Sequence, residues 1–259
     1  MVSLIANSEM KYQKAILCYL DILGFSKFVE QKISNPANVL IAIYHFLLRS
    51  MNPTQGYQTV LFSDSLVIID LLSNENDQEI TKSKIQNMLA NIADGQAFFL
   101  YEKDMVVRGG ITIGDIYFEP APKGLGICIF GPALIKAYEI ESKKSDWPRV
   151  VIDPCILKYP INFEWILKDE EDNYYLDYLG FNSVPQNYRG LDSFVVKHKD
   201  KIIKSLKVDN DKIRNKYKKM AKYHNNIINK MNSNYYWEDQ QLQFGDIIID
   251  LEAISEEKY

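Results

Sequence analysis

The sequence predicts an α/β (α+β) fold in which helices pack on one face of a mainly antiparallel sheet, followed by a helical C-terminal extension. Apolar runs of strand length and segments of helical periodicity follow one another in the order β, α, α, β, β, α, β, β, α, β as far as residue 152. The polar turn Ser63-Asp64-Ser65 is short, so the apolar runs on either side of it are expected to form an antiparallel hairpin. Farther on, the segment 191–232 carries apolar residues at near-helical spacing.

The first elements follow from local signals. Residues 15–20 form an apolar run that Asp21 closes, which indicates a buried strand, and a glycine and a serine then turn the chain into a helix. Pro36 suits the first turn of a second helix, and apolar residues at helical spacing give that helix a core face over 39–47. The hairpin strands, 57–62 and 66–69, and a helix over about 78–100 come next.

Glycines and prolines mark the later elements. The strand 106–114 contains glycines, which often mark the close approach of another backbone or a ligand. Pro132 suits the first turn of a helix that runs to about residue 142. The remaining expected elements are strands at 126–130, 147–152 and 174–179, two helices within 191–232 that join near Asp209, and a terminal strand at 244–251.

We divide the chain into an N-terminal lead (1–14), a core (15–155) and a C-terminal extension (156–259) that packs on the core as part of the same domain. The net charge of −4 argues against a protein that coats nucleic acid. Neither a signal peptide nor a run of about 18 apolar residues is evident, so we expect a cytoplasmic protein without a membrane partner. Cys18, Cys128 and Cys155 form no CxxC pair, and we expect reduced core residues.

Asp21 is the first candidate functional residue. A charge at the end of a buried strand is costly unless it is paired, and a metal ion is a common partner for such a carboxylate. Asp64, in the hairpin turn, reaches the same end of the sheet if the first strand (15–21) and the second (57–62) lie side by side. Asp is, however, also an ordinary turn residue. Two carboxylates and triphosphate oxygens are ligands that Mg²⁺ prefers, and the helix start after Asp21 can offer N–H groups to a phosphate.

Four segments resemble motifs of the class III nucleotide cyclases, in the family's order, over about residues 15–152. Leu20-Asp21-Ile22-Leu23-Gly24-Phe25-Ser26 resembles the first metal motif, and Phe62-Ser63-Asp64-Ser65 resembles the second metal aspartate in its hairpin. Arg108-Gly109-Gly110-Ile111-Thr112-Ile113-Gly114 is similar to the family's Arg-x-Gly-Ile-x-x-Gly strand, and residues 131–141 lie where the family places its next helix. The resemblance implies the family's ferredoxin-like core.

Within that family the sequence is most similar to the bacterial pyrimidine cyclases of Pycsar antiphage defence. The similarity includes Phe130-Gly131-Pro132-Ala133-Leu134, Ala137-Tyr138-Glu139 and Pro148-Arg149-Val150. It implies that UTP or CTP closes to the 3′,5′-cyclic monophosphate with release of diphosphate. The product is then expected to activate a separate effector.

The resemblance also implies a homodimer with sites at the interface. Two Mg²⁺ or Mn²⁺ ions would be held by Asp21, Asp64 and the Ile22 carbonyl. The β- and γ-phosphates would be held by backbone N–H groups around Leu23, Gly24, Phe25 and Ser26.

Two departures from the purine cyclases concern the helix and the base. Where those enzymes carry an Asn and a transition-state Arg on the helix, this chain has Ile135 and Glu139. The candidate substitute cations are Arg108, Lys136 and Arg149, and each also has an ordinary interpretation as a salt-bridge or surface residue. Tyr57-Gln58 stands where the purine cyclases carry a base-reading Lys, so Tyr57 either contacts a pyrimidine ring or is an ordinary strand aromatic.

Three alternatives remain at this stage. A purine cyclase would turn over ATP or GTP, which the missing base-reading Lys disfavours. A catalytically degenerate nucleotide sensor is favoured by the missing helix Asn and Arg and disfavoured by the two aspartates. A polymerase-like palm domain shares a two-aspartate metal site, but the chain has no obvious fingers or primer-binding region.

Overall fold

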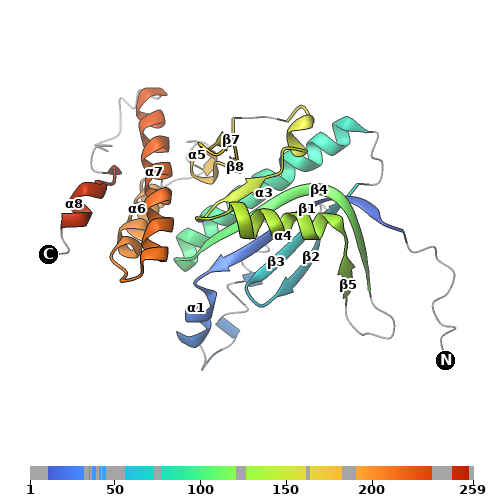
Figure 1. The fold of residues 1–259 in the computed structure, drawn as a ribbon, viewed down its shortest axis with the longest axis horizontal. Helices are drawn as coiled ribbons and strands as arrows, with labels where there is room; N and C mark the ends of the chain where they lie inside the picture. The colour runs from blue at the N-terminus through green and yellow to red at the C-terminus, as the bar shows by residue number, and fades with distance from the viewer. Residues whose placement is uncertain are drawn as a thin grey trace.

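The protein is described by a computed structural model that covers residues 11–31, 56–72, 77–120, 127–161, 164–182, 191–234 and 247–256, and positions 35, 37, 38, 41, 43 and 44. Within these residues, eight strands form one sheet with helices packed on it (Figure 1). The predicted α+β class and the helical C-terminal part are therefore confirmed.

The strands are β1 (Gln13–Leu23), β2 (Gln58–Phe62), β3 (Ser65–Leu71), β4 (Val106–Pro120), β5 (Ile127–Phe130), β6 (Val150–Ile152), β7 (Ile166–Lys168) and β8 (Tyr174–Leu176). The helices are α1 (Phe25–Gln31), α3 (Gln78–Lys103), α4 (Pro132–Lys144), α5 (Tyr178–Asn182), α6 (Leu191–Leu206), α7 (Asp211–Asn234) and α8 (Leu251–Glu256), with a 3₁₀ turn η3 (Ile156–Lys158). The predicted helix over 36–47 lies mostly outside the described residues.

The sheet has the order β2-β3-β1-β4-β6-β8-β7, and β5 pairs with β4. The hairpin of β2 and β3 is antiparallel, as predicted, and β1 lies antiparallel between β3 and β4. The sheet is mixed because β6 runs parallel to β4. A parallel pair needs a crossover connection, and α4 lies in that connection.

Both faces of the central strands are covered. Alternate residues of β1, such as Ile16 and Leu20, belong to the main hydrophobic cluster with side chains of α3, α6 and α7. Ala15 and Leu17 instead join a second cluster with Ala133 and other residues of α4. The prediction that helices cover one face was therefore wrong. The run Ala15–Leu20 is apolar without alternation because both faces of β1 are packed.

The glycines of β4 let α4 lie close to the sheet. A Cβ atom added to Gly110 would stand 2.7 Å from the Cβ of Ile140, closer than real Cβ contacts. The same added Cβ would stand 2.4 Å from the Ala137 carbonyl oxygen. Of the two expectations for this strand, a close backbone or a ligand, the structure thus shows a close backbone, that of α4. This packing fixes the height of the last turn of α4 above β1 and β4.

The C-terminal part shares the main hydrophobic cluster through buried residues of α6 and α7, among them Ile202, Met220 and Ile228. The terminal strand predicted at 244–251 was wrong over its described part, because residues 247–250 form no strand and α8 begins at Leu251. The Asn225 side chain accepts a hydrogen bond from Ile249 N–H and donates one to its carbonyl, at 2.9 Å each, so a side chain replaces the expected strand partner. None of the described helices is both long and apolar enough to cross a bilayer.

Candidate active site

Asp21 and Asp64 lie on neighbouring segments at one end of the strands of the sheet. Asp21 stands opposite Ser65 in the β1–β3 register, and the Ile22 N–H donates to the Asp64 carbonyl at 2.9 Å. Ser63, with a φ of 56°, takes the left-handed conformation that closes the two-residue turn between β2 and β3. β1 continues to Leu23, so Asp21 lies inside the strand rather than at its end.

Arg108 is the cross-strand neighbour of Asp21 on β4. Its Nε–H donates to Asp21 Oδ2 at 2.8 Å, and the two side chains are mostly buried. A buried arginine on a central strand requires such a partner, since an unpaired charge there would be costly. The structure therefore brings together three residues that the sequence singled out, Asp21, Asp64 and Arg108.

Glu141, in the last turns of α4, is a third carboxylate of this cluster. Its Oε1 lies 2.8 Å from the same Arg108 Nε, yet among the described residues Oε1 has no hydrogen-bond partner. The single Nε–H is directed at Asp21 instead. Burial raises the pKa of Glu141; the Asp21 and Asp64 charges add to this rise, and the Arg108 charge opposes it. The sequence analysis did not identify Glu141 as part of this cluster, because the only signal in the sequence is that Glu141 follows Ile140 in a helix.

Lys216 of α7 brings a second positive charge toward the cluster. Its pKa is lowered by burial and by the Arg108 charge, while the charges of Asp21 and Glu141 act in the opposite direction. The side chain thus lies within electrostatic range of the cluster. The sequence placed Lys216 on a lysine-rich helix, and the resemblance to the pyrimidine cyclases includes Lys216-Tyr217, but neither assigned Lys216 a role at the site.

Tyr19 adds a hydroxyl at the same end of the sheet. Its O–H donates to Ser65 Oγ at 2.7 Å, and its ring packs edge-on against Tyr138 of α4 at a centroid distance of 5.4 Å. Burial raises the pKa of Tyr19, so the phenol stays protonated near neutral pH. Because Ser65 follows Asp64 directly, this hydrogen bond stabilises the end of the hairpin turn.

Gly24 forms the turn between β1 and α1. Its φ of 84° lies in the left-handed region that glycine adopts without strain, and a Cβ there would meet nothing within 4 Å. The first helical bond runs from Phe28 N–H to the Gly24 carbonyl at 3.1 Å. The backbone N–H groups of Phe25, Ser26 and Lys27 therefore precede the helical hydrogen-bond pattern. Phe25 packs on the core, and Ser26 is exposed.

Tyr57 lies at the far end of the hairpin from Asp64. It lies five positions before Phe62 at the turn, which corresponds to about 17 Å along an extended strand. Its hydroxyl accepts a hydrogen bond from Asn91 Nδ2 at 3.1 Å, and burial raises its pKa to about 12. The structure therefore does not bring Tyr57 together with Asp21 and Asp64 of the same chain.

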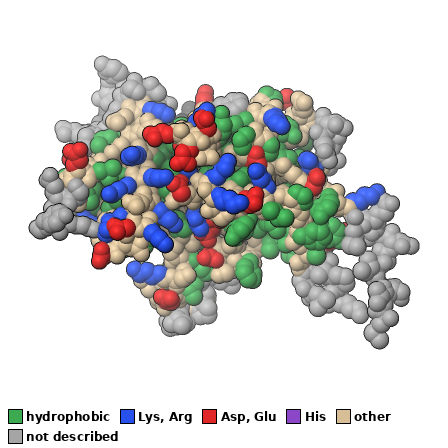
Figure 2. Space-filling view, viewed as in Figure 1, with side chains coloured by type: hydrophobic (Ala, Val, Ile, Leu, Met, Phe, Trp, Pro, Cys, Tyr) green, Lys and Arg blue, Asp and Glu red, His purple; other side chains and the backbone are tan. Residues whose placement is uncertain are grey.

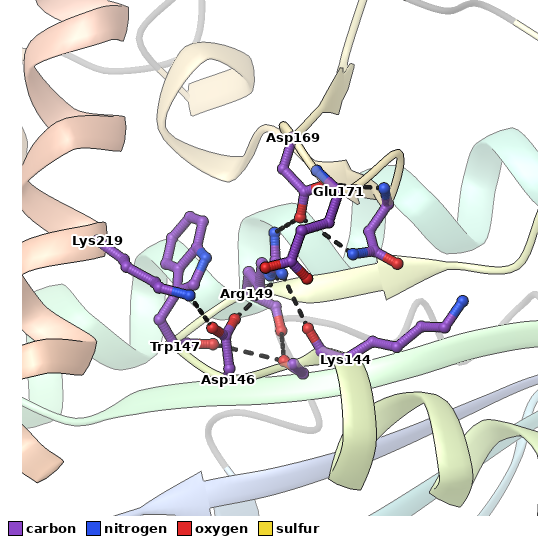
Figure 3. Close-up of polar contacts among 9 residues, drawn as sticks. Lys144, Asp146, Trp147, Arg149, Asp169, Glu171 and Lys219 are labelled. Atoms are coloured by element: carbon purple, nitrogen blue, oxygen red, sulfur yellow. Dashed lines mark hydrogen bonds and ion pairs between the residues drawn. The ribbon is translucent and has the colours of Figure 1, made fainter.

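Arg149 lies in a separate polar cluster at the start of β6 (Figure 3). Its guanidinium pairs with Asp169 at 2.7 Å and with Asp146 at 3.1 Å, and it lies 5.2 Å from the ring centroids of both Trp147 and Tyr175. Among the described contacts of its side chain, none reaches Asp21 or Asp64. Its backbone carbonyl accepts the Gly109 N–H at 2.9 Å, which ties this cluster to the strand that carries Arg108.

The helix positions that depart from the purine cyclases lie on the outer surface of α4. Ile135 is 63% exposed and Lys136 is also exposed. Glu139 pairs with Lys143 at 3.0 Å one turn later. The Arg108 ion pairs among the described residues are with Asp21 and Glu141, and neither involves Lys136 or Glu139.

The donor set at the sheet edge fits a hard divalent cation. In the described residues no group of three or more His, Cys, Asp or Glu side chains is arranged to enclose a metal. Mg²⁺, however, is commonly bound by one or two carboxylates together with substrate phosphates. Asp21 and Asp64 lie on neighbouring backbone segments and are residues of that type, and one Asp21 oxygen accepts a hydrogen bond from Arg108.

No protein-family model matches the sequence, and no curated protein does. Among solved structures, the adenylyl cyclase CyaB from P. aeruginosa is 13% identical over 64% of this chain and 94% of its own, with a TM-score of 0.47. The GTP-bound guanylate cyclase domain of RhGC from Catenaria anguillulae is 13% identical over 64% and 97%, with a TM-score of 0.44. The monomeric guanylyl cyclase domain of RhoGC from Blastocladiella emersonii is 12% identical over 64% and 95%, also at 0.44.

Proposed function

We propose that this protein is a nucleotide cyclase. The 3′-oxygen of a nucleoside triphosphate attacks its own α-phosphorus, a new O–P bond forms, the bond to the β-phosphate oxygen breaks, and diphosphate leaves as the hydroxyl proton is lost. The observation that carries the proposal is the convergence of Asp21, Asp64 and Arg108 at one end of the central strands, beside the Gly24 turn.

In this proposal Asp21, Asp64 and the Ile22 carbonyl hold Mg²⁺ or Mn²⁺. Held there, the ions would supply Lewis-acid chemistry, lowering the pKa of the 3′-hydroxyl and offsetting charge on the phosphates. The N–H groups of Gly24, Phe25 and Ser26 orient the β- and γ-phosphates. Arg108 restrains the Asp21 carboxylate through its 2.8 Å hydrogen bond and adds positive charge beside the reacting phosphate.

We further propose that the substrate is UTP, or else CTP. The support is the residue at position 57, where a tyrosine replaces a base-reading lysine of the purine cyclases. Tyr57 lies about 17 Å along the hairpin from the turn, which is too far to contact a base held by Asp21 and Asp64 of its own chain. In this proposal it contacts a base held by those two residues of a second copy. Its pKa of about 12 keeps the hydroxyl available as a donor.

The composite site requires a homodimer, and exposed apolar side chains support one. Phe62 is 80% exposed at the end of β2, and Ile135 and Tyr138 are exposed on α4. In Figure 2 hydrophobic side chains gather on the side where Figure 1 places α4 and β5. Such surface is costly in water and is typical of protein interfaces. The cyclic product would act as a second messenger for a separate effector in antiphage defence.

The experiment is incubation of the purified protein with each of the four NTPs and Mn²⁺, with products identified by mass spectrometry. The proposal expects cyclic UMP or cyclic CMP together with diphosphate. Cyclic AMP or cyclic GMP alone would establish a purine cyclase and refute the pyrimidine assignment.

A second candidate, a nucleotide sensor without turnover, is favoured by the exposed Ile135 and the Glu139–Lys143 pair on α4. These take the place of the expected transition-state pair. Calorimetric binding of an NTP without formation of any cyclic product would select this candidate over the enzyme.

A further inference from the structure

A cavity of about 270 Å³ opens between the Gly24 turn, the C-terminal end of α3 and α6. Leu23 and Gly24 line it, so the cavity adjoins the end of β1, the strand that carries Asp21. Its charged lining residues are Lys27, Lys103, Asp104, Lys201 and Lys204.

The lining carries an excess of positive charge. Both Lys201 and Lys204 pair with the one carboxylate, Asp104, at 3.2 Å. Asp104 ends α3 in the left-handed conformation, with a φ of 52°, and Lys201 Nζ also donates to its backbone carbonyl. A single carboxylate among four ammonium groups leaves the cavity strongly attractive to anions.

The positive charge of Lys201 is the one that this arrangement destabilises. Its side chain is 14% exposed, and burial lowers its pKa, with the charges of Lys204 and Lys27 adding to the effect and Asp104 opposing it. The positive charges of Lys27 on α1 and Lys204 on α6 thus both act unfavourably on the Lys201 ammonium group. A bound polyanion would relieve that repulsion.

We propose that this cavity binds the terminal phosphates of a triphosphate chain and the diphosphate that leaves. The inference rests on the proposed function for its substrate, but the binding itself requires only the lysines. It assigns phosphate binding to α6, which lies in the C-terminal extension and outside the segments that resemble the cyclase motifs. A point-charge contact from several lysines suits a phosphate chain, whose charge is spread over many oxygens.

The direct test is calorimetric binding of inorganic tripolyphosphate to the full chain in the absence of metal. Lys27 and Lys204 are exposed, so the double variant Lys27→Gln/Lys204→Gln keeps the fold. We expect it to weaken tripolyphosphate binding at least about tenfold, since each charge-assisted contact is worth a factor of that order. The control Lys218→Gln removes an exposed lysine of α7 that does not line the cavity and should bind like the wild type.

Equal binding by the wild type and the double variant, or no binding by the wild type, would overturn the inference. A KM for the nucleotide that is unchanged in an otherwise active double variant would overturn it too, while leaving the cyclase assignment intact. Conversely, lysine-dependent binding of tripolyphosphate by a protein that makes no cyclic nucleotide would refute the cyclase proposal and support the phosphate site.

Discussion

Arg108 Nε stands 2.8 Å from Asp21 Oδ2 and 2.8 Å from Glu141 Oε1, but its one N–H is directed at Asp21. Glu141 Oε1 is left without a hydrogen bond among the described residues. Arg108 therefore links a carboxylate of the sheet to a carboxylate of α4. Its contact with Asp21 is a hydrogen-bonded ion pair, whereas its contact with Glu141 is an ion pair without a hydrogen bond.

We expect Arg108→Met to destabilise the fold by about 3 kcal/mol, because removal of one partner leaves buried carboxylates unpaired. Urea unfolding monitored by circular dichroism measures the change. The double variant Arg108→Met/Glu141→Gln should recover at least about 1 kcal/mol, since it removes the buried charge on Glu141. Additive single effects would show that Arg108 and Glu141 are not coupled.

Gly110→Ala should shift α4 away from the sheet, because the added Cβ would lie 2.7 Å from the Cβ of Ile140. A loss of about 1–3 kcal/mol in the free energy of unfolding is expected for such overpacking. The matched control is Gly114→Ala, whose Cβ would stand 3.2 Å from the Cβ of Ala133 and needs a smaller adjustment. If both substitutions had equal effects, the close approach at Gly110 would not be limiting.

Acid should destabilise the protein through a buried histidine pair. Tyr178 O–H lies 2.7 Å from His198 Nε2, the two Nδ1 atoms of His198 and His224 are 2.9 Å apart, and His224 Nε2 lies 3.0 Å from the Ile247 carbonyl. Because a carbonyl only accepts, His224 Nε2 carries a proton. His198 Nδ1 then donates to His224, and Tyr178 donates to His198, so every contact is satisfied with both rings neutral.

Burial lowers the pKa of His224 to about 4, below its ordinary value of 6.5. Burial also lowers the pKa of His198 well below that ordinary value. The unfolded chain therefore takes up these protons at a higher pH than the folded chain. The contribution of the pair is fully present above about pH 6.5 and is lost as the pH falls toward 4. For His224 alone the loss from pH 7 to pH 5 is about 2 kcal/mol. His224→Gln should flatten the pH dependence of the urea midpoint, and an unchanged slope would contradict this account.

Tyr57→Phe tests base selection. It removes the hydrogen bond with Asn91 and the hydroxyl proposed to meet the pyrimidine. We expect kcat/KM for the preferred pyrimidine nucleotide to fall about tenfold, the value of one hydrogen bond to a substrate. Asn91→Ala is the control, since it removes the same internal hydrogen bond and keeps the hydroxyl. Equal losses in both variants would assign Tyr57 a supporting role only.

The sequence was sufficient to predict the hairpin, because its turn is short and polar. It gave the approach of Asp21 to Asp64 only as a condition, since local signals do not say which strand lies beside β1, and in the structure that strand is β3. Glu141 and Lys216 were not predicted, since their positions depend on how closely α4 approaches Gly110 and on where α7 packs. The helix layer on the second face was missed because a strand that is apolar throughout does not indicate which helix covers it. The prediction of a terminal strand was wrong because the Asn225 side chain, and not another backbone, pairs with Ile249.

The central claim is that Asp21 and Asp64 together support cyclisation of a pyrimidine nucleotide. The most direct measurement is cyclic UMP and cyclic CMP formation by the wild type, Asp21→Ala and Asp64→Ala at saturating Mn²⁺, followed by mass spectrometry, with urea midpoints confirming that each variant is folded. The account predicts a cyclic pyrimidine product from the wild type and none above the protein-free background from either variant. Full activity in either folded variant would contradict it.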